Sequence, residues 1–332
     1  MDHVFIVNPA AGNGKKNLTG ILASLHQRIR RVPTFRYRLY ETREKRDATA
    51  YIRNYCKEHN APVRFYACGG DGTLNEVVNG VAPFPQASVS VYPCGSGNDY
   101  VKYYGGAEPF LRMDDLIDGE EISVDLLRVD DLYAVNIINF GFDTRVAMTM
   151  DKVRRNPLFG GKRAYLTGVV HAVLTARKNR CRVWVDGQPL NPVAEKDGTV
   201  RNHPLMLLCT VANGQYVGGE YRCAPYSVND DGQADVCLVQ PVSVPQFVDL
   251  VGLYRDGQHL VSPKFKEIVH YMRGKHIQVR AEKGFAFSLD GEIVKRDSFD
   301  IDVLPKALRL CVPRSALMQK NVKQKGVCPD VK

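Results

Sequence analysis

The chain lacks several features that would assign it to a class at once. No apolar run in its 332 residues approaches the roughly 18 that a membrane-spanning helix needs. The N-terminal "MDHVFIVNP" has no basic region or cleavage site around its apolar run, so it predicts a first strand and not a signal peptide. The nine cysteines show no C-x-x-C spacing. Their odd number and their positions inside apolar runs favour buried free thiols in a reducing cytoplasm over disulfides or a zinc site.

The composition is that of an ordinary globular protein, and the positive net charge favours an acidic partner. Hydrophobic residues make up 44% of the chain and charged residues 24%, and this length favours two domains over one. The formal net charge is +9. Such a balance suits a nucleotide, a nucleic acid or an anionic membrane surface, and charge alone does not choose among them or exclude a merely solubilising surface.

The first third of the chain repeats one pattern three times. Apolar strands are expected at 3–7, 62–68 and 87–94, each followed by a loop of small residues and then by apolar residues at helical spacing. Repeated units of this kind build a parallel sheet with helices on its faces. Their loops meet outside the carboxyl ends of the strands, where such sheets bind ligands. We therefore expect an α/β nucleotide-binding domain over residues 1–125.

The pattern changes after residue 125. Alternating segments such as "RVWVDG" and "ADVCLVQPV" predict strands separated by turns, with helices only near 160–178 and 244–254. We expect a β-rich domain over residues 126–314. The basic tail, 315–332, is expected either to be loose or to pack on the first domain.

The stretch "CGGDGTLNEVVNG" (68–80) carries the strongest local signal. Its glycines let the backbone approach a ligand, and the spacing of Thr73 and Glu76 predicts a capping box that starts a helix at Thr73. Free N–H groups at that helix start would suit a phosphate. Asp71 would repel phosphates unless a bridging Mg²⁺ removed the conflict, although a plain Gly-Asp-Gly turn is almost equally compatible with the local sequence.

Three other motifs are weak when taken singly. "NPAAGNGK" (8–15) is not a Walker A loop, because Pro9 stands where a glycine is needed and no Ser or Thr follows Lys15. "GSGND" (95–99) predicts a helix-entry loop. "SLDGE" (288–292) predicts a hairpin turn, with Glu292 an ordinary glutamate on local evidence.

In this order, however, the four motifs resemble the diacylglycerol kinase catalytic family, which includes bacterial soluble lipid kinases and sphingosine kinases. "SVDLLRV", "NFGFDT" and "VNDDGQADVCLV" extend the resemblance over nearly the whole chain. It implies an α/β domain like those of NAD kinases and phosphofructokinases, a β-sandwich domain, and an active site between them. It also implies a cytoplasmic ATP- and Mg²⁺-dependent kinase, active on diacylglycerol or a related lipid alcohol, that visits the membrane peripherally and binds no nucleic acid. Both a monomer and a homodimer stay open.

The family's residue roles carry over position by position. The resemblance makes Glu292 the proton acceptor and links Asp71 and Asp125 to the catalytic magnesium network. Ser96 replaces the family's usual threonine and keeps its hydroxyl. A structural Mg²⁺ would use Asp231 with the carbonyls of Val228 and Gln233. The ATP-binding residues implied are Asn8, Pro9, Ala10, Ala11, Gly12, Thr42, Gly70, Asp71, Gly72, Thr73, Leu74, Asn75, Glu76 and Ser96.

Two alternatives to a lipid kinase remain, together with a membrane hypothesis. An NAD kinase shares the Gly-Gly-Asp-Gly loop but not the other motifs, and a nucleotide-binding regulator without catalysis would not need Asp71, Asp125 and Glu292. The segment 150–182 carries nine basic residues, one acidic residue and an apolar stretch. It suits either an anionic lipid surface or a helix packed in the core.

Overall fold

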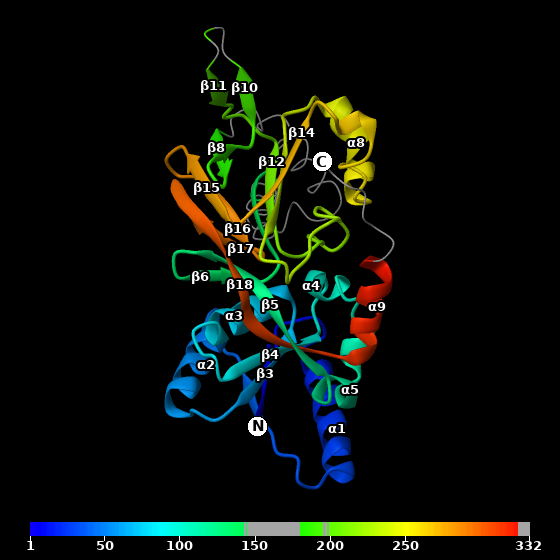
Figure 1. The fold of residues 1–332 in the computed structure, drawn as a ribbon. Coiled ribbons are helices and arrows are strands. Elements are labelled where there is room, and N and C mark those ends of the chain that lie inside the picture. Colours follow the sequence, from blue (N-terminus) through cyan, green and yellow to red (C-terminus); the bar gives the residue numbers. More distant parts are fainter. Residues whose placement is uncertain (143, 145–179, 195–196, 198, 325–332) are drawn as a thin grey trace, which may run out of the picture.

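The computed structural model describes residues 1–142, 144, 180–194, 197 and 199–324. Figure 1 shows two halves stacked end to end, with helices around the lower half and strands dominating the upper half. In the lower half the elements before the second domain are β1 Asp2–Val7, α1 Lys15–Arg31, β2 Arg38–Glu41, α2 Asp47–Glu58, β3 Val63–Gly69, α3 Asp71–Val81, β4 Ala87–Pro93, α4 Asp99–Lys102, η1 Glu108–Leu111, α5 Met113–Ile117 and β5 Glu120–Val129.

The remaining described elements belong mostly to the upper half. They are β6 Leu132–Ala134, β7 Ile137–Gly141, β8 Cys181–Val185, β9 Gln188–Pro189, β10 Pro192–Ala194, β11 Val200–Asn202, β12 Leu208–Ala212, β13 Ala234–Val239, α8 Val244–Arg255, η3 Pro263–Phe265, β14 Val269–Gly274, β15 His276–Ala281, β16 Ala286–Leu289, β17 Glu292–Lys295, β18 Ser298–Val312 and α9 Arg314–Gln324.

The first half contains the parallel sheet that the sequence predicts. Its strands run in the order β2-β1-β3-β4, each parallel to its neighbour. All seven residues of β3 are buried, as expected of a parallel strand covered by helices on both faces. The loops after β1, β3 and β4 therefore emerge at one edge of the sheet. That edge faces the second half of the molecule.

The second half is a sandwich built mainly from antiparallel strands. A six-stranded sheet has the order β14-β13-β12-β7-β16-β17. One face of this sheet packs against β15 and β8 through a shared core that includes Ile138, Phe140 and Val211. Because side chains alternate across a strand, Ile137, Asn139 and Thr210 lie on the opposite face. α8 covers part of that opposite face, packing through a separate cluster that includes Phe142, Leu208 and Leu250.

Strand β18 joins the two halves. Its 15 residues pair with β15 near the start and with β4 near the end, and β5 runs antiparallel along most of its length. The register shifts between Leu304 and Leu308, where a bulge redirects the strand. β5 itself runs continuously through residue 125, where the sequence places the domain boundary. β5 and β18 therefore both run from one half of the molecule into the other.

Several local expectations can be compared with the structure. Helix α3 starts at Asp71, two residues before the expected Thr73, and no side chain caps it, so the predicted capping box is wrong. Thr73 and Glu76 bind other partners, described below. The helix near 244–254 is present as α8. The helix expected near 160–178, and with it most of the basic segment 150–182, lies outside the described residues.

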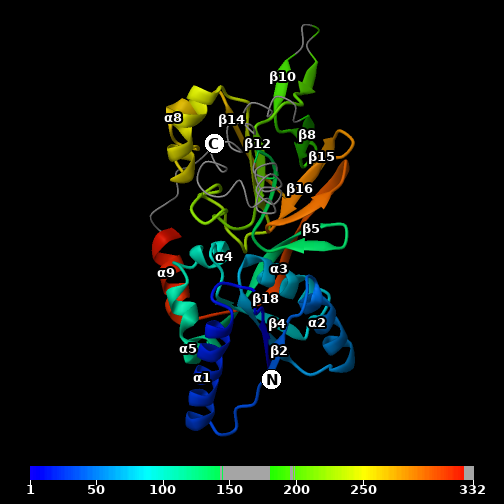
Figure 2. The same cartoon turned by 180° about the vertical axis from the view of Figure 1, so that it is seen from behind.

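The start of the C-terminal tail packs against the first half. α9 contacts η1, and Figures 1 and 2 both show α9 alongside α4 and α5 of the first half. The buried ammonium of Lys320 lies 3.3 Å from Asp230 Oδ2 and 5.1 Å from the centre of the Tyr103 ring. The eight described cysteines are all free, and only Cys94 among them is not buried. In the part of the chain that the structure describes, no helix is both long and apolar enough to cross a membrane.

Candidate active site

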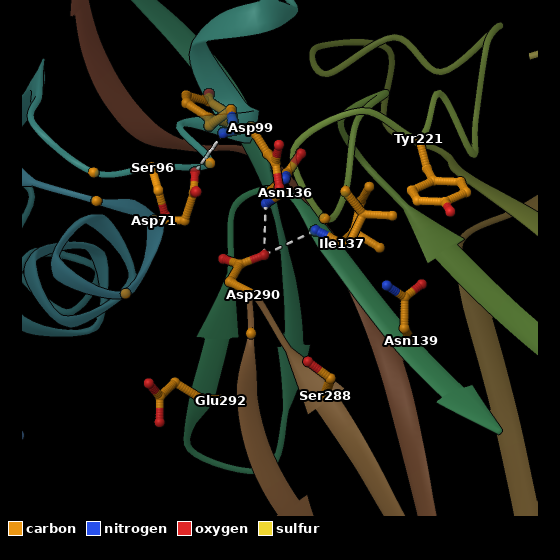
Figure 3. Close-up of a pocket in the computed structure, with 18 of the residues that line it drawn as sticks. Asp71, Ser96, Asp99, Asn136, Ile137, Asn139, Tyr221, Ser288, Asp290 and Glu292 are labelled. Atoms are coloured by element: carbon orange, nitrogen blue, oxygen red, sulfur yellow. Dashed lines mark hydrogen bonds between the residues drawn. The ribbon is translucent and has the colours of Figure 1, made fainter. Parts of the chain in front are cut away.

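One large cavity of about 1210 Å³ lies between the two halves. Its lining changes character from one end to the other. The end at the parallel sheet is made of the loops after β1, β2, β3 and β4. The end in the second half is made of the outer face of the six-stranded sheet and α8. Figure 3 shows the region where the two ends meet.

The glycines of the loops are required by close backbone contacts. A Cβ on Gly95 would lie 2.5 Å from the Cα of Gly70. Gly12 has a φ of +54°, and a Cβ there would lie 2.1 Å from the carbonyl oxygen of Cys94. No other residue fits these positions without moving the backbone. The three loops therefore form one compact layer that presents its backbone to the cavity.

Two long helices begin at this layer without a side-chain cap. α1 starts after Gly14 and α3 after Gly70, and at neither helix does a cap side chain accept a hydrogen bond from a backbone N–H. At α3 the first backbone hydrogen bond is donated by Leu74, so the N–H groups before it have no acceptor among the described residues and suit an anion. At α1 the N–H groups of Lys16 and Asn17 already donate to the carbonyls of Asn13 and Gly14. The open start of α3 is where the sequence predicts a phosphate site, and phosphate binding there stays a prediction.

Polar side chains fix the positions of the loops. Asn8 donates from Nδ2 to Thr73 Oγ1 at 3.0 Å and accepts from the Ala10 N–H at 2.9 Å. Glu76 accepts the backbone N–H of Arg46 at 2.9 Å, at the start of α2. These bonds use Thr73 and Glu76 to hold neighbouring loops together, which explains why they form no capping box.

Asp71 and Asp99 form a carboxylate pair at the edge of the cavity. Asp71 Oδ1 accepts the backbone N–H of Asp99 at 2.7 Å, while Oδ2 accepts no hydrogen bond from the described residues. Burial, and secondly the nearby charge of Asp99, raise the pKa of Asp71 above its ordinary value. Asp99 in turn accepts the Gly219 N–H at 2.9 Å and pairs with Lys102 at 2.6 Å. Asp99 thus ties the first half to a loop of the second.

Glu292 enters the cavity from the second half, at the start of β17, and its carboxylate pairs with Lys45 of the first half. The preceding Asp290 has a φ of +48° and sits in the hairpin turn. Its Oδ1 accepts the Ile137 N–H at 2.8 Å and the Asn136 N–H at 3.1 Å, and its Oδ2 accepts the Val135 N–H at 2.8 Å. Burial raises the pKa of Asp290 to about 6 despite these bonds. Asp290 therefore fixes the turn that presents Glu292 (Figure 3).

Most residues that the sequence assigns to ATP line this cavity. The exception among them is Asn75, whose Nδ2 turns toward the second half and donates to the Tyr133 carbonyl at 3.1 Å and to Asp290 at 3.3 Å. The lining includes Asn8, Pro9, Ala10, Ala11, Gly12, Thr42, Gly70, Asp71, Gly72, Thr73, Leu74, Glu76, Ser96 and Glu292.

Asp125 lies apart from the cavity lining. It is completely buried in β5, where Oδ2 accepts the Gly232 N–H at 2.6 Å and Oδ1 the Lys306 N–H at 2.7 Å. Burial raises its pKa above the ordinary value. The carboxylate braces the β18 bulge and the turn at Gly232. Its place in a catalytic magnesium network stays a prediction, and the contacts observed are structural.

The residues proposed for a structural Mg²⁺ do not fit a metal ion as they stand. Asp231 Oδ2 pairs with the Arg273 guanidinium, and Oδ1 accepts the Gln233 N–H at 3.1 Å. Arg273 also reaches Asp235 at 3.4 Å. The Arg273 guanidinium therefore already pairs with the Asp231 carboxylate that a structural Mg²⁺ would need as a ligand. Neither here nor around Asp71 do the described residues contain a group of three or more His, Cys, Asp or Glu side chains placed to hold a metal.

The site proposed for the catalytic Mg²⁺, at Asp71, differs from the structural site at Asp231. Asp71 offers Oδ2 at the cavity, beside a second carboxylate, and oxygen ligands of this kind are those that Mg²⁺ takes together with phosphates and water. A divalent cation would also reverse the unfavourable burial of the Asp71 charge. These residues fit one Mg²⁺ that binds with a nucleotide.

The sequence singled out neither Lys45, Asp99 nor Asp290. Asp99 and Asp290 lie inside "GSGND" and "SLDGE", so they could have been found by asking which acidic residues stand beside turn glycines. Lys45 carries no local signal, because only the approach of the two halves places it against Glu292.

The far end of the cavity is apolar. Its lining residues there come from the six-stranded sheet and the residues next to its strands, from α8 and from η3, and we call this end the apolar chamber. The lining residues include Phe142, Leu207, Leu208, Val239, Val242, Val244, Phe247, Leu250, Val251 and Phe265. An apolar chamber joined to a polar, glycine-lined end is suited to an amphipathic ligand.

Comparison with known proteins agrees with this geometry. Residues 2–129 match the family model of the diacylglycerol kinase catalytic domain, and residues 136–312 match the YegS C-terminal NAD kinase beta sandwich-like domain. A protein of Staphylococcus epidermidis named "Putative lipid kinase" is 30% identical over 74% of this chain and 75% of its own. A diacylglycerol kinase of Bacillus subtilis is 26% identical over 86% of this chain and 88% of its own.

A solved structure supports the fold. The crystal structure of a diacylglycerol kinase from Bacillus anthracis superposes with a TM-score of 0.66 at 20% identity, covering 95% of this chain and 98% of that one. The parallel sheet and the sandwich are therefore an architecture that a related chain also adopts.

Proposed function

Because the chain belongs to the diacylglycerol kinase catalytic family, we propose that it transfers the γ-phosphoryl group of ATP to the hydroxyl of a lipid alcohol, in a Mg²⁺-dependent reaction. The observation that carries the proposal is the single cavity with a phosphate-suited end and an apolar end. Diacylglycerol or a closely related lipid alcohol is the acceptor that best matches this division.

The nucleotide occupies the glycine-loop end. The open N–H groups at the start of α3 bind its phosphates, and the hydrogen bond from Asn8 to Thr73 keeps the loops after β1 and β3 in register. Asp71 would hold a Mg²⁺ ion, which would supply positive charge to balance that of the phosphates.

The acceptor occupies the other end, with its chains in the apolar chamber and its hydroxyl beside Glu292. Glu292 takes the hydroxyl proton while the acceptor oxygen forms a bond to the γ-phosphorus. The bond from that phosphorus to the β,γ-bridging oxygen breaks, and ADP leaves with the bonding electrons. Asp290 keeps the Glu292 turn in place through its three backbone hydrogen bonds.

The lipid must reach this site from a bilayer. We propose that the protein visits an anionic membrane surface reversibly, with the basic segment 150–182 as the contact. Co-sedimentation with vesicles that contain or lack phosphatidylglycerol tests this step, and binding should weaken steeply with salt.

The experiment for the activity uses ATP labelled in the γ-phosphate, a total lipid extract and NAD in one reaction. Labelled lipid supports the proposal. Labelled NADP would identify an NAD kinase, and no labelled product in the presence of bound ATP would identify a nucleotide-binding regulator. Product analysis of the labelled lipid then gives the acceptor.

A further inference from the structure

An acidic turn lies where the second half of the molecule meets the first. Residues 228–233 read "VNDDGQ", and the buried carboxylate of Asp125 accepts the Gly232 N–H of this turn. Burial first, and then the negative charges of Asp231 and Asp230, raise the pKa of Asp125 above its ordinary value. Carboxylates gathered in this way need a nearby cation. The family motifs predict that a structural Mg²⁺ ion supplies it.

Two cationic side chains already contact the aspartates of the turn. The Arg273 guanidinium pairs with Asp231. The ammonium of Lys320, on α9, lies 3.3 Å from Asp230 Oδ2 and donates to Asn229 Oδ1 at 3.3 Å. Lys320 is only 7% exposed, and a lysine this deeply buried is rare unless its charge is paired. The turn is therefore the partner that stabilises Lys320 in its buried position.

The same ammonium also lies over two aromatic rings of the first half. Its nitrogen is 5.1 Å from the centre of the Tyr103 ring and 5.9 Å from the centre of the Tyr104 ring. A cation within about 6 Å of a ring centre is attracted to the ring face, and more strongly where water is excluded. Lys320 thus contacts oxygens of the second half and rings of the first half at once.

Asn229 continues this connection into α4. Its Nδ2 donates to the Tyr104 hydroxyl at 2.8 Å and to the Tyr100 hydroxyl at 3.4 Å. Asn229 is 1% exposed, so these hydrogen bonds are shielded from water. At the start of α4, the N–H groups of Asp99 and Tyr100 donate to Asp71 Oδ1 at 2.7 Å and 3.4 Å. A continuous path of contacts therefore leads from the α9 ammonium to the Asp71 carboxylate.

Close packing fixes the place of α9 beside α4. Gly105 has a φ of +102°, and a Cβ there would lie 1.9 Å from Gln319 Oε1. Ala316 is fully buried in the core of the first half. Figures 1 and 2 show α9 next to the α4 region from both sides. The helix therefore holds the Lys320 ammonium at one point of the junction between the halves.

We propose that Lys320 takes over the task of a structural Mg²⁺ ion: it joins the acidic turn to α4 and thereby positions Asp71. An ammonium brings a positive charge and three N–H donors, whereas Mg²⁺ needs about six oxygen ligands. Because this cation belongs to the chain, the junction needs no metal and depends on the docking of α9. Lys320 does not line the cavity, so it is a positioning residue. The proposed function enters only as the role given to Asp71.

Thermal unfolding without nucleotide is the first test. Lys320→Met keeps most of the apolar stem but removes the charge, and it should lower the melting temperature by roughly 3–6 °C. Lys320→Arg keeps the charge and should recover most of this loss. The wild-type protein should melt at the same temperature in Mg²⁺ and in EDTA. Lys264→Met is the matched control, because its ion pair with Asp249 is exposed and its loss should change the melting temperature by about 1 °C or less.

Hydrogen exchange distinguishes a positioning residue from a lysine that only packs its own helix. In Lys320→Met, the amides of Asp99 and Tyr100 and those of residues 229–232 should exchange roughly threefold faster or more. Asp230→Asn removes the other charge of the pair at a partly exposed position, so it keeps the test valid if Lys320→Met fails to fold. It should accelerate exchange at the same amides, and the double variant should lose less stability than the sum of the two single variants.

Three results would overturn the inference. One is a melting temperature that Mg²⁺ raises both in the wild type and in Asp71→Asn, since that places a metal outside the Asp71 site. The second is an unchanged melting temperature in both Lys320→Met and Asp230→Asn. The third is faster exchange confined to α9. None of these measurements uses ATP or a lipid, so each result leaves the proposed function to its own test.

Discussion

Lys45 and Glu292 form an ion pair across the cavity, one residue from each half of the molecule. Lys45 is exposed on the loop between β2 and α2, and Glu292 opens β17. Both line the cavity at the point where the γ-phosphate and the acceptor hydroxyl would meet. The ion pair therefore connects the nucleotide-binding end of the cavity with Glu292, the residue proposed as the proton acceptor.

This relationship makes a prediction for Lys45. When ATP binds, its phosphates compete for the ammonium, which frees the Glu292 carboxylate to accept a proton. Lys45→Met should raise the KM for ATP several-fold and lower kcat less than a change at Glu292 does. Steady-state kinetics measure both, with Lys57→Met, an exposed lysine on α2, as control. A KM equal to that of the control would leave the pair as a surface contact only.

Glu292→Gln tests the proton acceptor. The amide keeps the size of the side chain but cannot accept the proton, so turnover should fall by about 10²–10⁴-fold. ATP binding and melting temperature should remain close to the wild-type values, because the side chain is at the cavity and not in the core. Glu267→Gln, at an exposed glutamate outside the cavity lining, is the control. Turnover near the wild-type level would make Glu292 a hairpin residue.

Asp71→Asn tests the catalytic Mg²⁺ site. The asparagine Oδ1 can still accept the Asp99 N–H, so the fold should be preserved. The loss of the charge should weaken metal binding, and activity should fall strongly with at most partial rescue by excess Mg²⁺. Activity titrated with Mg²⁺ in both proteins gives the answer. A stable and fully active variant would refute the assignment.

Asp290 should make stability depend on pH. Its folded pKa is about 6 and its unfolded pKa is near the ordinary 3.8, so the folded protein binds the proton more tightly. The contribution of this group to stability is therefore complete below about pH 3.8 and is lost as pH rises through 6. The free energy of unfolding, measured for the wild-type protein and Asp290→Asn between pH 4 and 7, should show the advantage of the wild type shrinking as pH rises. A difference independent of pH would contradict the expectation.

Asp231→Ala tests whether Asp231 binds a structural Mg²⁺ ion or only pairs with Arg273. Because Arg273 already pairs with Asp231, we expect the variant to lose roughly 1 kcal/mol of stability or less, equally in Mg²⁺ and in EDTA. Thermal unfolding in both buffers is the measurement. If Mg²⁺ raises the melting temperature of the wild type but not of the variant, the structural metal site predicted from the sequence exists after all.

The sequence by itself determined the parallel sheet, its three ligand loops and the residues that carry the family motifs. Glycine and helix periodicity are local properties, and a loop that needs close backbone approach has few alternatives at Gly12, Gly70 and Gly95. The capping box failed because Thr73 and Glu76 found partners on other loops, which no local rule anticipates.

Only the tertiary structure decided what depends on the meeting of distant segments. Lys45 meets Glu292, Asn75 meets Asp290, and Asn139 meets Ser288 across separations that the chain order does not encode. The roles of Asp125 and Asp231 depend likewise on the Lys306 N–H and the Arg273 guanidinium. The physical reason is that a carboxylate or an amide is versatile, and its function is set by the donors, charges and cavity that folding brings to it.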